Sequence, residues 1–389
     1  MSRDKNTIVI YLGATRYDTL NIFAKELGKY FQKTGYKVVY VDMREGCEEI
    51  MHSLIGNNSI KFILDFNGRT SEVSCVDESL YNNRLNAPYV AWFVDSPIHH
   101  VDRLKSNIEQ YYALFMDRMH VDFSNKYFSR LTKTAYLPLA GYGHYSDTVA
   151  KDKDIVFLGS YGNYKDVQEQ INNINNEDVV ALCYLVMDKM VNDMDISIES
   201  CIEQVWQENE VKCSDDVRDY IFSVFGLVDI FIRNLNRGRV INILINAGID
   251  VHVYGAGWDK FSVTEDNAKY LHIHGNVDLE QTEEIMKSAR IVLNVMPGFK
   301  DGSHDRILSA MLAKSVCLTD KSKYLMEEFK DGEDIAFYSL SELTKLPDIV
   351  RDLLSDEERF KEIAENGYKK AVENHTWEKR AQQILEFVG

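Results

Sequence analysis

One segment passes from a strand through a glycine-containing loop into a helix, and it decides the fold. It reads Asn294-Val-Met-Pro-Gly-Phe-Lys-Asp-Gly-Ser-His-Asp-Arg-Ile-Leu-Ser-Ala-Met311 and follows the apolar residues 291–293. We predict that the strand ends at Pro297, that the loop runs to Ser303, and that a helix starts near His304. In a parallel sheet, ligands bind outside the carboxyl ends of such strands, so this loop is a candidate binding site.

The first turn of this predicted helix contains a cation, Arg306, where acidic residues are usually preferred. Unpaired N–H groups at a helix start attract anions. A guanidinium beside them is expected if an external anion such as a diphosphate must be held. The alternative is an arginine that pairs within the chain, with Asp301 or Asp305.

Strands and helices alternate on both sides of this segment. A first series of predicted strands covers residues 7–12, 37–41, 62–66, 89–94, 112–116 and 134–137, and a second covers 154–158, 250–254, 270–274, 290–295 and 315–319. Helices are predicted between them, for example at 18–33, 279–288 and 303–314. The strands are almost continuously apolar, which is typical of parallel sheets covered on both faces, so we predict an α/β protein.

The two series predict two α/β units with a boundary near residues 141–153. Residues 166–246 interrupt the second unit, contain no proline and have apolar residues at helical spacing, so they predict a helical insertion. Residues 356–388 are charged and amphipathic and predict a helical tail, with a break near Gly367.

Composition excludes several classes of protein. The 389 residues include 44 Lys and Arg and 61 Asp and Glu, so the net charge is 44 − 61 = −17 and a nucleic-acid partner is not expected. No apolar run approaches the roughly 18 residues of a membrane span, and the run near the start, residues 8–12, is too short and too quickly polar for a signal peptide, so neither is expected. The six cysteines are scattered without a C-x-x-C, which predicts free thiols and a cytoplasmic location.

Two further loops follow predicted strands of the second unit. Tyr254-Gly-Ala-Gly-Trp258 has glycines that permit close backbone approach and aromatic rings, Tyr254 and Trp258, that could flank a base or a sugar; a tight structural turn is the alternative. Gly275-Asn276-Val277 could offer backbone groups to a base edge. Because these loops end strands of one sheet, we expect them to converge with the loop before Arg306 on one crevice.

The first unit offers two carboxylates at strand ends. Asp18 closes the loop that starts at Gly13, where it is expected to cap the next helix or, alternatively, to contact an acceptor. No G-x-G-x-x-G is present, so nicotinamide binding is weakly supported. Asp95 follows an apolar strand and precedes Pro97, where it could orient or deprotonate a hydroxyl group or simply form a turn. The adjacent residues 99 and 100 are histidines, expected on the surface and assigned no role.

The order and spacing of nine segments carry a family resemblance. They are Ala91-Trp-Phe-Val-Asp-Ser-Pro97, Leu137-Pro-Leu-Ala140, Ile155-Val-Phe-Leu-Gly-Ser160, Val253-Tyr-Gly-Ala-Gly-Trp258, Leu293-Asn-Val-Met-Pro297, Asp305-Arg306, Leu318-Thr-Asp320, Ile363-Ala-Glu-Asn-Gly367 and His375-Thr-Trp377. Together they resemble the GT-B-fold glycosyltransferases, and within them the group similar to the spore maturation protein CgeB. The resemblance spans most of the chain apart from the insertion.

This resemblance implies two Rossmann-like domains that face a cleft. Residues 1–150 would form the acceptor-side domain, with a last helix at about 374–389 packing back on it, and residues 151–373 the nucleotide-sugar domain. The donor would be a nucleoside diphosphate sugar, most simply a UDP-sugar, the acceptor a hydroxyl group on a protein, glycan or small molecule, and neither a metal nor a further cofactor would be needed. Asp95 or Asp18 would serve the acceptor.

The resemblance also implies roles for individual donor-site residues. Arg306 and the backbone of Gly302 and Ser303 would hold the diphosphate, approached by Gly159 and Ser160. The nucleoside pocket would be lined by Gly255, Gly257, Gly275, Asn276 and Val277, and the remaining predicted donor-site residues are Tyr254, Trp258, Pro297, Gly298, Asp301, Asp305 and Ser309.

One departure from the wider superfamily bears on function. The resemblance implies two glutamates that hold hydroxyl groups of the donor, and this sequence has Asp301 and Ser309 at those positions. Two alternatives to a hexosyltransferase stay open, and the missing glutamates favour the first of them. One is a nucleotide-sugar-binding or scaffold protein without catalysis, and the other is a sugar-nucleotide epimerase of the same fold, for which no acid/base pair is apparent.

Overall fold

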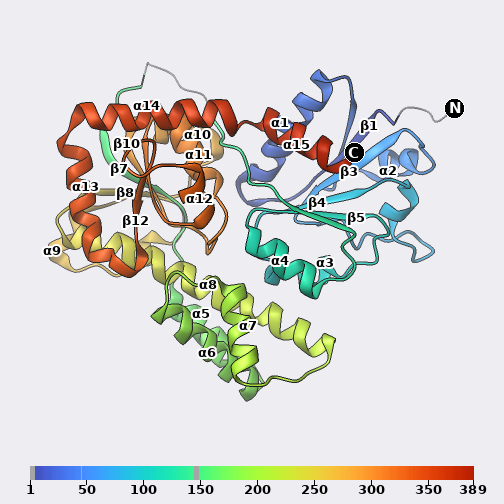
Figure 1. Cartoon of the computed structure of the whole chain (residues 1–389), viewed down its shortest axis with the longest axis horizontal. Helices are drawn as coiled ribbons and strands as arrows, with labels where there is room; N and C mark the ends of the chain where they lie inside the picture. Colours follow the sequence, from blue (N-terminus) through green and yellow to red (C-terminus); the bar gives the residue numbers. More distant parts are fainter. Residues whose placement is uncertain (1–4, 45, 144–148) are drawn as a thin grey trace. The chain divides into compact units, whose positions relative to one another are not determined.

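The computed structural model of the protein describes residues 5–44, 46–143 and 149–389 (Figure 1). The chain divides into two compact units. Unit 1 comprises Met1–Leu139 with Thr376–Gly389, and unit 2 comprises Ala140–His375. Of the boundary segment predicted at 141–153, residues 144–148 lie outside the described residues.

Unit 1 is built on a parallel sheet with the strand order β2-β1-β3-β4-β5-β6. Its strands are β1 (Thr7–Leu12), β2 (Lys37–Asp42), β3 (Ile60–Phe66), β4 (Tyr89–Phe93), β5 (Tyr111–Phe115) and β6 (Lys133–Tyr136). Every residue of β1 and β4 is buried, as expected for central strands covered on both faces, and this is why they read as continuous apolar runs.

The helices of unit 1 connect these strands, and the C-terminal helix joins them. They are η1 (Arg16–Asp18), α1 (Thr19–Lys33), α2 (Glu48–Leu54), η2 (Tyr81–Leu85), η3 (Pro97–His99), α3 (Val101–Leu104), α4 (Arg118–Tyr127) and α15 (Trp377–Val388). The Trp377 ring lies 4.6 Å from that of Phe23 and 6.3 Å from that of Trp92. Aromatic packing therefore holds α15 against α1 and the sheet of unit 1.

Unit 2 has a second parallel sheet, in the order β12-β11-β10-β7-β8-β9. Its strands are β7 (Lys153–Leu158), β8 (Val251–Tyr254), β9 (Leu271–Ile273), β10 (Ala289–Asn294), β11 (Val316–Asp320) and β12 (Ala336–Tyr338). Its helices are α5 (Tyr164–Asn172), α6 (Glu177–Asn192), α7 (Ile198–Glu208), α8 (Asp215–Asn246), η4 (Trp258–Lys260), α9 (Glu265–Ala268), α10 (Leu279–Ser288), α11 (Asp305–Leu312), α12 (Lys323–Glu328), η5 (Leu340–Lys345), α13 (Leu346–Ser355) and α14 (Glu357–Asn374). The predicted α/β class with parallel sheets is confirmed.

The insertion predicted at 166–246 consists of α5 to α8. The side chains of Asn163, Asn176, Ser197 and Ser214 accept backbone N–H groups at the four helix starts, which is why the helices begin there. The 32-residue helix α8 runs on from the insertion to the sheet, where its last turns pack with β7 and β8 in one apolar core. The insertion is therefore anchored in unit 2 by a continuous helix (Figure 1).

Two details of the fold differ from prediction. The break predicted near Gly367 is wrong, because α14 continues through this residue and the helix ends at Asn374. A Cβ at Gly367 would lie 2.6 Å from the carbonyl oxygen of Asp334, so the missing side chain allows a close helix contact rather than a break. The edge strand β12 was not predicted, since three residues are too few to show a strand pattern.

Candidate functional site

Arg306 lies at the carboxyl edge of the sheet of unit 2. Its Nη1 donates a hydrogen bond of 2.8 Å to Oδ1 of Asn294, the last residue of β10, and its guanidinium carbon lies 5.8 Å from the centre of the Phe157 ring on β7. A Cβ at Gly159, after β7, would lie 3.6 Å from Nη2. No carboxylate oxygen of the described residues is hydrogen-bonded to this guanidinium or lies within ion-pair distance of it. The alternative, an ion pair of Arg306 within the chain, is therefore not seen among the described residues.

The start of α11 provides the helix terminus predicted before Arg306. His304 caps the helix, and its Nδ1 accepts the backbone N–H of Arg306 at 3.2 Å. The hydroxyl group of Ser303, which is 2% exposed, has no hydrogen-bond partner among the described residues. A helix N-terminus, a guanidinium and an unused hydroxyl group therefore meet at one place, and all three favour an anion.

Burial and charge change the protonation of this helix start. Burial lowers the pKa of His304 well below its usual value, and the positive charges of Arg306, Arg237 and Arg233 lower it further. The neutral ring can keep Nδ1 as an acceptor for the helix, so its 3.1 Å contact with the carboxylate of Asp305 is not a charged pair. Burial raises the pKa of Asp305 and lowers that of Arg306, while the attraction between these two groups opposes both shifts.

Two of the cations near His304 come from the insertion and were missed by sequence analysis. Arg233 and Arg237 are four residues apart on α8, so they share one face of the helix. Arg233 pairs with Asp229 at 2.5 Å, and Nη1 of Arg237 donates to the carbonyl oxygen of Ser160 at 2.8 Å. The only sequence signal was this spacing of two arginines in a mostly apolar helix.

Three strand-end loops of unit 2 contact one another. The N–H of Gly255 donates to the carbonyl oxygen of Gly275 at 2.6 Å, and the N–H of Gly159 donates to that of Tyr254 at 2.8 Å. Gly255 has a φ of 139°, and a Cβ there would lie 2.7 Å from the backbone of Gly159. The predicted convergence of the β8 and β9 loops is therefore a direct backbone contact, which the β7 loop joins and into which Gly257, with a φ of 83°, also fits. Their convergence with the loop before Arg306 stays a prediction.

The aromatic residues of the β8 loop lie differently from their prediction. Trp258 is fully buried, and its Nε1 donates to the carbonyl oxygen of Gly159 at 2.7 Å. Its predicted contact with a ligand does not fit this geometry, because the indole fills the core and holds the β7 loop. The Tyr254 ring, 6% exposed, stacks on His274 with ring centres 4.4 Å apart. Of the β9 loop, Asn276 is exposed and Val277 half-buried.

The loop between β10 and α11 is fixed on both sides. Lys300 donates to the carbonyl oxygen of Met194 in the insertion at 2.5 Å, and the hydroxyl group of Ser322 donates to that of Gly302 at 2.7 Å. Gly298 has a φ of 96°, and a Cβ there would lie 3.2 Å from Oδ1 of Asp229 on α8. Pro297 is buried. The insertion thus forms one wall of this loop.

Two of the predicted donor-site residues, Asp301 and Ser309, are both buried. Asp301 is 7% exposed, and its Oδ2 lies 3.8 Å from Nζ of Lys323. Ser309 is 6% exposed; its hydroxyl oxygen accepts the N–H of Tyr142 at 2.9 Å and donates to the carbonyl of Asp305. The hydroxyl group of Ser309 is engaged within unit 2, so its predicted donor contact requires these bonds to rearrange.

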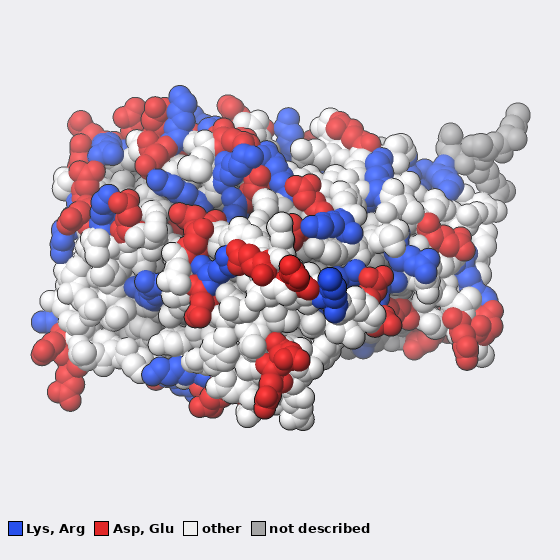
Figure 2. All heavy atoms as spheres, turned by 60° about the horizontal axis from the view of Figure 1, so that its bottom comes forward, with Lys and Arg blue, Asp and Glu red and all other residues white. Residues whose placement is uncertain are grey.

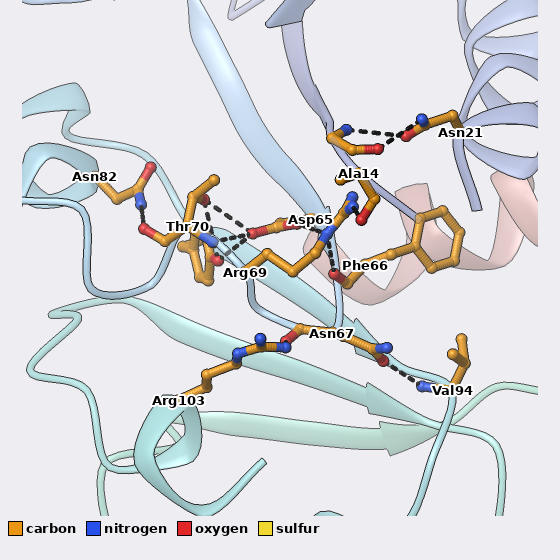
Figure 3. Close-up of polar contacts among 12 residues, drawn as sticks. Ala14, Asn21, Asp65, Phe66, Asn67, Arg69, Thr70, Asn82, Val94 and Arg103 are labelled. Carbon is orange, nitrogen blue, oxygen red and sulfur yellow. Dashed lines mark hydrogen bonds and ion pairs between the residues drawn. The ribbon is translucent and has the colours of Figure 1, made fainter. Parts of the chain in front are cut away.

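At the carboxyl edge of the sheet of unit 1, a buried carboxylate organises the turn after β3 (Figure 3). Oδ2 of Asp65 accepts the N–H of Thr70 at 2.6 Å, its hydroxyl group at 2.9 Å and that of Tyr89 at 2.7 Å. Burial raises the pKa of Asp65, and the charge of Arg69 opposes that shift. The network orients the turn Asn67–Gly68, and Oδ1 of Asn67 accepts the N–H of Val94, directly after β4, at 2.8 Å.

The predicted acceptor-side carboxylates follow β1 and β4, the strands on either side of β3. Asp18 is the N-cap residue of α1, as predicted, but it has a left-handed conformation and its side chain makes no capping hydrogen bond. Its Oδ1 instead accepts Nδ2 of Asn21 and Nη1 of Arg44, the latter at 3.0 Å. Asp95 is half-buried after β4.

One of the two adjacent histidines is not on the surface as expected. His100 is 8% exposed, and neither ring nitrogen has a hydrogen-bond partner among the described residues. Burial lowers its pKa to about 3, so the ring is neutral at ordinary pH.

The surface and the helices of the described chain bear on partners. On the face drawn in Figure 2, basic and acidic residues alternate and no continuous basic stripe is seen. None of the helices among the described residues is long and apolar enough to span a membrane.

Solved structures place this architecture in a known class. The structure of Anabaena Alr3699/HepE in complex with UDP-glucose matches with a TM-score of 0.57 at 12% identity over 98% of both chains. Sucrose-phosphate synthase from Thermosynechococcus elongatus matches with a TM-score of 0.53 at 11% identity, covering 99% of this chain and 98% of the other, and a glycosyltransferase from Rickettsia africae with 0.52 at 10%, with the same coverage. The chain therefore has the GT-B fold.

The sequence itself matches one family. Residues 236–386, which begin within α8 and end within α15, match the model of the family described as glycosyl transferase-like. No curated protein matches the sequence.

Proposed function

We propose that the protein is a glycosyltransferase that moves a sugar from a nucleoside diphosphate sugar, first of all a UDP-sugar, to a hydroxyl acceptor. The observation that carries this proposal is the anion site at the carboxyl edge of unit 2. There the start of α11, the hydroxyl group of Ser303 and the guanidinium of Arg306 meet beside the arginines of α8. Support also comes from the glycosyl transferase-like match over residues 236–386 and from the UDP-glucose complex of HepE.

The chemistry follows from where negative charge develops. When the bond between the anomeric carbon and the diphosphate breaks, the diphosphate leaves with its bonding electrons and gains charge. Arg306, assisted by Arg237 and Arg233, would stabilise that charge electrostatically. Asp95, or Asp18, would accept the proton of the acceptor hydroxyl as its oxygen bonds to the anomeric carbon.

In this proposal the loops after β7, β8 and β9 hold the nucleoside, and the protein needs no metal. The finer resemblance to the CgeB-like group and the hexosyl nature of the sugar are parts of the same proposal. Activity that survives a chelator such as EDTA would support metal independence.

A second candidate function is supported by one observation. The hydroxyl group of Ser309 is engaged in hydrogen bonds within unit 2. The family resemblance also implies glutamates at the positions of Asp301 and Ser309, and this chain has neither. A protein that binds a nucleotide sugar without transferring it would show this pattern.

The decisive experiment separates binding from turnover. Ligands that bind only the folded state raise its melting temperature, so a thermal-shift screen over UDP-, GDP-, dTDP- and ADP-sugars identifies the donor. We expect one class to stabilise the wild type and to lose that effect in Arg306→Ala, but not in the control Arg351→Ala on α13. Release of the nucleoside diphosphate distinguishes the transferase from the binding protein, and an absence of any shift would refute both.

A further inference from the structure

At the carboxyl edge of the sheet of unit 1, some charged side chains are fully hydrogen-bonded within the chain and others are not. Arg44 donates to both carboxylates near it, through Nη1 to Asp18 at 3.0 Å and through Nε and Nη2 to Asp42 at 2.8 and 2.6 Å. These three side chains form a local cluster in which the cation is fully engaged. The turn after β3, between the loops that carry Asp18 and Asp95, is different.

Two guanidinium groups lie on consecutive carbonyl oxygens of that turn (Figure 3). Nε of Arg69 donates to the carbonyl of Phe66 at 3.1 Å, and Nη1 of Arg103 donates to the carbonyl of Asn67 at 3.0 Å. The two carbonyls belong to neighbouring residues, so both guanidinium groups are hydrogen-bonded to the same short stretch of backbone. A further contact, 3.5 Å from Nη1 of Arg69 to the carbonyl of Ala14, fixes the first of them beside the β1 loop.

Several N–H groups of this pair are not used. Within the described residues, Nη2 of Arg69 and both Nε and Nη2 of Arg103 have no hydrogen-bond partner. The side chain of Arg69 is only 19% exposed. A half-buried guanidinium whose N–H groups still lack acceptors is suited to bind a planar or tetrahedral oxyanion through two parallel hydrogen bonds.

The charge of the pair is only partly balanced. Oδ1 of Asp65 lies 3.7 Å from Nε of Arg69, too far for a hydrogen bond, and this oxygen has no other partner among the described residues. Arg103 takes part in no ion pair with a described residue. The fully buried Asp65 therefore faces Arg69, and no carboxylate of the described residues lies within ion-pair distance of Arg103.

We propose that the acceptor carries an oxyanion, either a phosphate or a carboxylate, and that Arg69 and Arg103 bind it at the Asn67–Gly68 turn. The proposal rests on the proposed function, because it names the chemical class of that reaction's acceptor. With the oxyanion on this turn, an adjoining hydroxyl group of the acceptor is directed to the loop of Asp95 or of Asp18. Arg69 and Arg103 are then specificity-determining residues, and a neutral sugar lacks the group they recognise.

A binding experiment tests this without knowledge of the complete acceptor. The full chain is saturated with UDP to occupy the donor site, and glycerol 3-phosphate, glucuronate and glycerol are titrated while the melting temperature is followed. We expect at least one anionic probe to bind tenfold or more tightly than glycerol, and the stronger of the two identifies the oxyanion. Arg69→Gln and Arg103→Gln should each weaken that probe at least tenfold. Arg130→Gln, an exposed arginine of the same unit, should leave it unchanged.

Each outcome decides a separate question. Equal binding of anionic and neutral probes, or full binding in the Arg69 and Arg103 variants, overturns the proposal. Arg103→Lys keeps the charge but not the guanidinium fork, so a loss of affinity in this variant at an unchanged unliganded melting temperature excludes a purely structural role. If UDP itself does not bind, the proposed function fails; the probes are then titrated against Arg306→Ala, in which any remaining anion binding reports on unit 1 alone.

Discussion

The carboxyl edges of the two sheets are built from the same elements but use their charges differently. In unit 2, Arg306, Arg233 and Arg237 surround His304 at the start of a helix, and the hydroxyl group of Ser303 has no described partner. In unit 1, one oxygen of Asp65 accepts hydrogen bonds from Thr70 in the next turn and from Tyr89 on β4, and Arg44 donates hydrogen bonds to two carboxylates. Unit 2 therefore gathers positive charge around one helix start, whereas unit 1 uses most of its charged groups in hydrogen bonds within the chain and leaves Arg103 without an ion-pair partner among the described residues.

The largest effect is expected when the two arginines of the insertion, Arg233 and Arg237, lose their charge. We expect Arg233→Gln with Arg237→Gln to weaken donor binding at least 100-fold, since hydrogen bonds between charged groups contribute about 1.5–3 kcal/mol each. Arg69→Gln with Arg103→Gln in unit 1 should leave donor affinity within about twofold of the wild type. Calorimetric titration with the donor measures both. Arg218→Gln, on the first turn of α8, is the matched control. An equal loss of donor affinity in the two double variants would show that the donor does not depend on the arginines of unit 2 in particular.

The buried network of unit 1 predicts a loss of stability rather than of donor binding. Asp65→Asn removes the charge that faces Arg69 and replaces one acceptor with an amide in a fully buried site. We expect a loss of about 1–3 kcal/mol in the free energy of unfolding, the usual cost of an unsatisfied buried group. Urea unfolding measures it, with the exposed Asp102→Asn as a control. A variant as stable as the wild type would show that the network does not hold the turn.

We expect a fall in pH to lower the stability of unit 1 because His100 is buried as a neutral ring. Below pH 6.5 the unfolded chain binds a proton at this residue, whereas the folded ring stays neutral down to its pKa of about 3. Stability therefore falls as the pH falls through this window, by about 2 kcal/mol between pH 6.5 and 5. His100→Leu should remove this part of the acid sensitivity in urea unfolding, and the exposed His52→Leu should not. His304 in unit 2 supplies a similar window that the variant retains; unchanged acid sensitivity would contradict the assignment.

The sequence predicted the parallel sheets because their central strands are buried on both faces and therefore continuously apolar. The loop before Arg306 and the start of α11 near His304 were also predicted, since strand end, glycine and first turn follow one another in the chain. These features are local, and local patterns are readable without tertiary contacts.

What could not be predicted depends on contacts across the fold. Arg237 reaches Ser160 over 77 positions of sequence, and nothing in α8 alone marks it as part of a site. Trp258 follows a glycine-rich turn that looks open, but its indole points into the core. Arg103 lies beside Asn67 only because β3 and β4 are neighbours in the sheet. The roles given to the site residues of both units stay predictions until they are measured.

The smallest test compares one strand-end glycine from each unit. Gly298 has a φ of 96° and faces Asp229 on α8, so Gly298→Ala should cost about 1 kcal/mol of stability and weaken the donor site a few-fold. A Cβ on Gly13 would lie 3.1 Å from Nη1 of Arg69, the far end of a flexible side chain. Gly13→Ala should therefore change stability by less than about 0.5 kcal/mol, yet displace Arg69 and weaken the anionic probe. Thermal unfolding and probe titration of both variants measure this, and a Gly13→Ala variant that binds the probe fully would separate Arg69 from the oxyanion.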